Sequence, residues 1–167
     1  MNHRAILVGA LGLVLATASG VGAQGSGKLA GHGTLGARGC RHDRSSFTVS
    51  LAVNAGGTWD AVQSDGPSFS GTWTARGRKG RVLKLAFDPA SEEALKTVVA
   101  GDVALLCDIT EPVTITSAVA KTFTLTLTRK GRRAALLLRY VVKGRAGGRS
   151  GTARETIRAS GPWTPAG

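Results

Sequence analysis

The sequence predicts an all-β protein, an antiparallel meander of about eight or nine strands that closes as a barrel in preference to a sandwich, with one short helix. Apolar and polar residues alternate along segments such as 46–53 and 122–128, with the period of two expected of half-buried strands. Turns rich in glycine or charge separate these runs at short intervals. This spacing is typical of strands joined by hairpin turns.

The alternating runs define nine expected strands. They lie near residues 28–36, 45–55, 57–63, 68–76, 81–88, 112–120, 121–129, 134–143 and 151–160. Within the sixth run, Val113, Ile115 and Val119 have the same parity, so we expect them to share one face of the sheet.

The segment 89–100 is the exception, because its apolar residues recur with helical spacing. Asp88 is a suitable N-cap residue, Pro89 suits the first helical position, and Gly101 is a suitable stop. We therefore expect a helix of about three turns that covers one open end or face of the barrel.

Residues 1–23 have the layout of a cleavable signal peptide, which leaves 24–167 as a single β domain. A basic start around Arg4 precedes about a dozen apolar residues, whereas a membrane anchor needs roughly 18–20. The first cysteine is Cys40, too far along for a lipid-anchored leader. The sequence thus predicts a secreted or periplasmic bacterial protein without a transmembrane segment in its mature form.

The two cysteines, Cys40 and Cys107, are expected to form a disulfide in an oxidising compartment. The alternative is a metal site formed by Cys40, His42 and Asp43 with His32 nearby, but this spacing matches no standard zinc pattern. We therefore expect no metal and no cofactor.

The chain is strongly basic, with a formal net charge of +12. Such a charge favours binding to polyanions of the cell envelope, although it also serves solubility alone. The candidate polyanion-binding residues lie in two turns and are Arg76, Arg78, Lys79, Arg81, Arg129, Lys130, Arg132 and Arg133. Aromatic residues are not interleaved with them, which disfavours nucleic acid as the partner.

A short repeat places Trp59 and Trp73 in equivalent positions, in Gly57–Ala61 and Gly71–Ala75. With Phe69 they are candidates for the aromatic wall of a cavity that binds a small apolar ligand. The alternative is a packed core cluster, since aromatic residues dominate the cores of small β domains.

The Gly57-Thr58-Trp59 element resembles the first-strand signature of lipocalins, secreted barrels that hold small apolar ligands. A lipocalin carries this element on its first strand and has a C-terminal helix. Here at least one strand precedes the element and no such helix follows, so the resemblance concerns barrel shape and does not assign the chain to the family.

In the last run, Glu155 has the parity of Ala153, Ile157 and Ala159, which makes it a candidate interior carboxylate. Tyr140 has the inward parity of its own strand and is a candidate partner. A buried carboxylate needs hydrogen bonds or a raised pKa, so the pair is a candidate ligand-binding group. The alternative is a solvated glutamate near the barrel mouth, paired to an arginine.

These features favour an exported, non-enzymatic binding protein of the bacterial envelope or exterior. Its ligand is either a small apolar molecule in the barrel or a polyanion at a basic rim. One alternative is a secreted enzyme with Glu155 or His42 as acid or base, and another is a structural or inhibitory protein acting through its surface. An outer-membrane barrel is disfavoured because outward positions hold mainly Thr, Ser, Arg and Lys.

Overall fold

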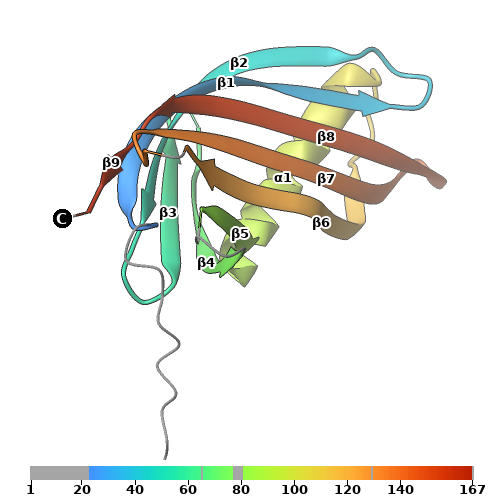
Figure 1. The fold of residues 1–167 in the computed structure, drawn as a ribbon. Coiled ribbons are helices and arrows are strands. Elements are labelled where there is room, and N and C mark those ends of the chain that lie inside the picture. The colour runs from blue at the N-terminus through green and yellow to red at the C-terminus, as the bar shows by residue number, and fades with distance from the viewer. Residues whose placement is uncertain (1–22, 65, 77–80, 129, 167) are drawn as a thin grey trace, which may run out of the picture.

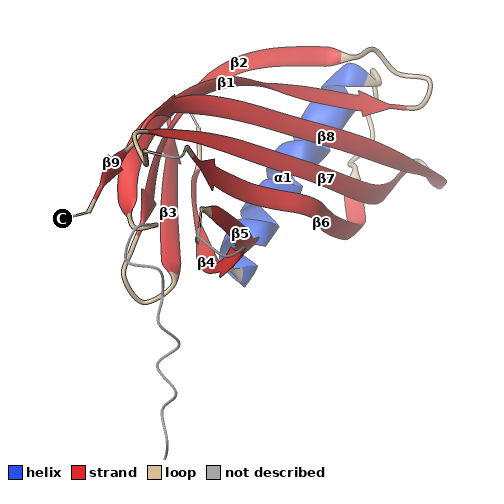
Figure 2. Ribbon diagram, viewed as in Figure 1, coloured by secondary structure: helices blue, strands red, loops and turns tan. Residues whose placement is uncertain are grey.

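The computed structural model of the chain describes residues 23–64, 66–76, 81–128 and 130–166. Nine strands and one helix follow one another along the chain (Figures 1 and 2). They are β1 (Gly25–Ala37), β2 (Asp43–Val53), β3 (Thr58–Gln63), β4 (Ser68–Arg76), β5 (Val82–Phe87), α1 (Pro89–Leu106), β6 (Thr114–Leu127), β7 (Arg133–Ala146), β8 (Arg149–Pro162) and β9 (Thr164–Pro165). Residues 1–22 of the predicted leader, which spans 1–23, lie outside the described residues, and its last residue, Ala23, is buried.

The sheet closes on itself as an eight-stranded antiparallel barrel. Each strand from β1 to β8 pairs with the next along the chain, and β8 pairs with β1. The two-residue β9 adds beside the start of β1. The predicted all-β meander, closed as a barrel, is therefore confirmed.

The predicted strands 112–120 and 121–129 are one long strand, β6, that carries two register shifts. The first shift, between Ile115 and Ser117, inserts a residue and reverses the inward parity beyond it. Val119 is consequently 44% exposed, so its expected place on one face with Ile115 is wrong. The second shift, between Ala120 and Thr122, restores the parity that buries Phe123.

Two glycines allow neighbouring strands to approach closely where the barrel curves. A Cβ on Gly31 would stand 1.9 Å from the carbonyl oxygen of Arg158 on β8. A Cβ on Gly71 would stand 1.9 Å from the carbonyl oxygen of Ala86 on β5. Both distances are far below van der Waals contact, so these positions accept only a residue without a side chain.

The barrel core is centred on aromatic side chains. Trp59 is 1% exposed, and its ring packs edge-on against Phe87 and Phe123 at centroid distances of 5.6 and 5.3 Å. Phe87 and Phe123 in turn lie 4.6 Å apart. Such pairs add to the free energy of burial itself and hold this half of the barrel closed.

Helix α1 begins as expected but runs further. Asp88 is its N-cap, and the Asp88 carboxylate accepts a hydrogen bond from the Ser91 backbone N–H at 2.7 Å. The helix continues through Gly101 to Leu106 instead of ending near residue 100. Gly101 is exposed, and the half-buried Val103 and Leu106 pack against the core beyond it, so burial overrides the stop signal.

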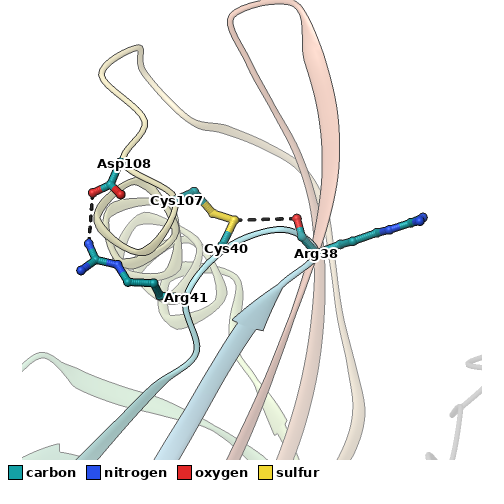
Figure 3. Close-up of a disulfide and its surroundings, with 5 residues drawn as sticks. All are labelled: Arg38, Cys40, Arg41, Cys107 and Asp108. Carbon is teal, nitrogen blue, oxygen red and sulfur yellow. Dashed lines mark hydrogen bonds and ion pairs between the residues drawn. A yellow bond between two sulfur atoms is a disulfide. The ribbon is translucent and has the colours of Figure 1, made fainter.

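Figure 1 shows α1 running beneath the curved sheet formed by β6, β7, β8, β1 and β2. Both of its ends are fixed to the barrel. At the N-terminal end, the Ser70 backbone N–H on β4 donates to the Ser91 hydroxyl at 2.7 Å. At the C-terminal end, the predicted Cys40–Cys107 disulfide joins the β1–β2 loop to the residue after the helix (Figure 3).

Candidate functional site

The inner faces of β7 and β8 bring the two polar candidates of the barrel interior together. Tyr140 and Glu155 are direct partners in the antiparallel register, so their side chains lie on the same inward face. Tyr140 is 2% exposed and Glu155 is half-buried. Both side chains therefore point into the barrel, as the alternation along each strand predicts.

Both side chains carry a buried polar atom without a hydrogen-bond partner among the described residues: the Tyr140 hydroxyl and Glu155 Oε2. Burial raises the pKa of Glu155 to about 7, and the negative charge of Asp102 on α1 acts in the same direction. Burial also raises the pKa of Tyr140 to about 12, with contributions from nearby carboxylates. The alternative interpretation pairs Glu155 with an arginine, and no such pair is found among the described ion pairs.

The three aromatic candidates share the inward face but are packed against other groups. Trp59 lies opposite Gly71 in the β3–β4 register, between the positions of Phe69 and Trp73. The Trp59 indole N–H donates to two backbone carbonyls at 3.0 Å, and the Trp73 indole N–H donates to the Asn54 carbonyl at 3.1 Å. With their polar atoms already bonded, these rings fit the core-cluster alternative.

The outer faces of β7 and β8 carry a second constellation, formed by cations. In the register, Arg139 lies opposite Thr156, which is flanked on β8 by Arg154 and Arg158. Lys143 lies opposite Thr152, one outward position beyond Arg154. All four cations are exposed, and they alternate between the two strands in the order Arg158, Arg139, Arg154, Lys143.

We call these four residues the basic staircase. Each member is diagonal to the next, about 7–8 Å away across the strand pair, and none lies directly opposite another. Like charges that face each other directly destabilise a sheet, so the diagonal placement limits that cost while keeping four cations on one face.

Acidic residues are almost absent from this side of the barrel. The contiguous strands β6, β7, β8 and β1 contain nine lysines and arginines and a single acid, Glu155, which points inward. Among the described ion pairs, Arg41 binds Asp108 and Lys96 binds Glu92 and Glu93, and no pair includes a member of the basic staircase. The outer face therefore has a positive charge that no described carboxylate neutralises.

The two turns predicted to bind polyanions lie at one end of the barrel. The Leu127 backbone N–H donates to the Arg81 carbonyl at 2.8 Å, which joins the ends of β6 and β5. Arg76, Lys130, Arg132 and Arg133 are exposed and Arg81 is half-buried. The remaining candidates, Arg78, Lys79 and Arg129, lie outside the described residues.

The two acid–base candidates of the enzyme alternative lie on opposite sides of the sheet. Glu155 points inward beside Leu35. The ring of His42 lies over Gly36, the next residue of β1, where a Cβ would stand 2.5 Å from Nδ1. Since successive strand residues face opposite ways, Glu155 and His42 do not form a pair.

Two open surface pockets occur on the described chain. One is bordered by Lys28, Ser50 and Asp60 and the other by Ser46, Phe47 and Gln63. Neither is lined by the tryptophans, Tyr140 or Glu155. Within the described ranges, no group of three or more His, Cys, Asp or Glu side chains is placed to hold a metal ion.

Sequence reasoning missed the basic staircase, although part of its signal was available. On β8, Arg154 and Arg158 alternate with Glu155 and so face the other side of the sheet. On β7, Arg139 and Lys143 alternate in the same way with Tyr140. Each strand alone therefore indicates outward cations. The diagonal order across two strands depends on the register, which a sequence without a tight turn motif does not fix.

Comparisons of the chain with protein-family models, with curated proteins and with solved structures found no match. None of the helices in the described part of the chain has the length and apolar character needed to span a membrane. The functional inference consequently depends on the two faces of β7 and β8 alone.

Proposed function

We propose that this chain is an exported, non-enzymatic binding protein that holds a linear polyanion on the outer face of its barrel. The observation that carries the proposal is the basic staircase, four exposed cations in diagonal order on a sheet region that has no outward acid. Regularly spaced, unpaired cations attract a chain of regularly spaced anionic groups. Export is supported by the leader-like residues 1–23 and by the Cys40–Cys107 disulfide.

The polyanion that best fits is an acidic glycan. Two of the staircase cations, Arg139 and Lys143, lie opposite threonines whose hydroxyl groups are suited to sugars and sulfate or carboxylate oxygens. The other two, Arg158 and Arg154, lie opposite Leu137 and Val141, which offer apolar contact to a sugar ring. None of the outward positions of β7 and β8 holds an aromatic residue on which a base could stack. We therefore place the proposed binding surface on the outer face of β7 and β8, whereas the sequence alone predicted it in the basic turns.

The test uses heparin as the probe and compares two charge-matched variants by titration at several salt concentrations. The first replaces Arg139, Arg154 and Arg158 with Gln. The second replaces three exposed cations that belong to neither the staircase nor the basic turns, Lys28→Gln, Arg38→Gln and Lys84→Gln.

We expect the staircase variant to lose at least tenfold in affinity and to show a weaker salt dependence, because fewer counterions are released per bound chain. The control variant should lose much less, since it removes the same net charge from other surfaces. Equal losses in both variants would mean that heparin responds to net charge alone, and would refute a defined binding face. Wild-type affinity that does not change with salt would refute electrostatic binding altogether.

A further inference from the structure

The interior of the barrel contains a second polar site that the proposed function does not use. It is built from the Tyr140 hydroxyl and Glu155 Oε2, both buried and without hydrogen-bond partners among the described residues. Tyr140 is 98% buried and directly opposite Glu155 in the register, so its hydroxyl group is on the same side of the sheet as the carboxylate. Buried polar atoms in proteins are otherwise almost always paired.

The groups around this pair are acidic. Asp102 on α1 contributes to the raised pKa of Glu155, and the charge of Asp43 on β2 contributes to the raised pKa of Asp102 after burial itself. The carboxylates of Glu92 and Glu93 also raise the pKa of Tyr140. Lys96, the cation on this helix, already binds Glu92 and Glu93 at 3.4 and 3.0 Å.

The walls beside the pair are apolar and partly made of small residues. Gly33 on β1 has no side chain, and a Cβ there would stand 3.8 Å from Glu155 Oε1, at ordinary contact distance. Leu35, Val142 and Ala153 are buried on the same inward face. Glu155 is half-buried as a whole residue, but its Oε2 atom is buried together with the Tyr140 hydroxyl.

We propose that Glu155 and Tyr140 bind the ammonium group of a small organic amine on the inner face of the barrel. The carboxylate supplies the charge, and the Tyr140 hydroxyl accepts a hydrogen bond from the ammonium N–H. Leu35, Val142 and Ala153 pack against the apolar body of the amine. A metal ion fits less well, since the described residues offer no cluster of three ligands here.

The charge balance makes the proposal testable through pH. With its pKa at about 7, Glu155 is mostly protonated at pH 6 and mostly ionised at pH 8. An alkylamine stays protonated through this range, as lysine does. Butylamine should therefore bind roughly tenfold more tightly at pH 8 than at pH 6, and binding at pH 6 should release close to one proton.

The experiment measures butylamine, butanol and calcium binding to the full chain by calorimetry at both pH values. Butylamine should bind saturably, and butanol, which matches its shape without the charge, should not. Glu155→Gln should abolish the pH dependence and weaken butylamine binding at least tenfold at pH 8, and Tyr140→Phe should weaken it several-fold. Glu111→Gln, at an exposed carboxylate, is the control and should behave as wild type.

Thermal unfolding of each variant establishes that it is folded before binding is compared. Equal binding of butanol and butylamine, or no saturable butylamine binding at either pH, overturns the proposal. Calcium binding that is lost in Glu155→Gln would replace the amine with a metal ion and also overturns it.

Discussion

Replacing Glu155 by Gln should stabilise the protein above neutral pH and leave it nearly unchanged at pH 4.5. The folded protein holds the Glu155 proton with a pKa of about 7, against 4.5 for an unperturbed glutamate. Because the folded state binds this proton more tightly than the unfolded state, folding stability falls as the pH rises from about 4.5 through 7. The amide of the variant cannot ionise, so it escapes this loss.

The magnitude follows from the same two pKa values. At about 1.4 kcal/mol per pKa unit, ionising the buried carboxylate costs the folded state at most roughly 3–4 kcal/mol. Glu155 is half-buried, so solvent screening reduces this cost, and we expect a gain of roughly 1–3 kcal/mol at pH 8.5. For a domain of this size that corresponds to a rise in Tm of roughly 2–12 °C.

The assay is thermal unfolding followed by circular dichroism at half-unit steps from pH 4.5 to 8.5, for wild type, Glu155→Gln and Glu111→Gln. The difference between wild type and Glu155→Gln should grow with pH and level off above pH 8. Glu111 is exposed, and its variant should follow wild type throughout. A difference between wild type and Glu155→Gln that stays constant over the whole range would refute the assignment of a raised pKa to this carboxyl group.

Three further predictions concern the fold and use Tm or urea unfolding as the measurement. Replacing Cys40 and Cys107 by Ser removes a link that spans 67 residues and should cost up to about 4 kcal/mol, while wild type under reducing conditions should reproduce the loss. Asp88→Ala removes the acceptor for the first turn of α1 and should lower the Tm by roughly 2–4 °C, whereas Asp88→Asn should retain most of the cap. Gly71→Ala should lower the free energy of unfolding by about 3 kcal/mol or more, because the new Cβ meets a carbonyl oxygen at 1.9 Å. Gly101→Ala should raise the free energy of unfolding by about 0.5–1 kcal/mol, because the new Cβ meets nothing within 4 Å. The same sign in both glycine variants would contradict the stated packing.

Features of the fold that depend on one strand or one helix end at a time were predictable. Period-two alternation places Tyr140 and Glu155 inward, and the register makes them partners. Asp88 caps the helix at the expected residue, because capping is a local interaction between neighbours in sequence. The pairing of Cys40 with Cys107 needed only the inference that the compartment is oxidising.

Features that depend on tertiary contacts were not predictable. One extra residue between Ile115 and Ser117 reverses the face of Val119, and nothing in the local composition marks this bulge. Likewise, Gly101 is a reasonable helix stop until the packing of Leu106 and the disulfide at Cys107 hold the following residues in place. The basic staircase has the same origin, since its diagonal order exists only across two paired strands.

The two proposed sites share β7 and β8 but are electrically separate. Arg154 precedes Glu155 in the sequence, yet burial and Asp102 set the pKa of Glu155, and no arginine of the outer face contributes to its shift. The reason is the alternation of side chains along the strand, which directs Arg154 into water and Glu155 into the barrel. Water and salt screen the electric field of Arg154, so this field has little effect on the buried carboxyl group. Substitutions in the staircase should therefore change heparin binding without moving the pH at which Glu155 titrates. Failure of either proposal leaves the other standing, because each depends on a different face of the same pair of strands.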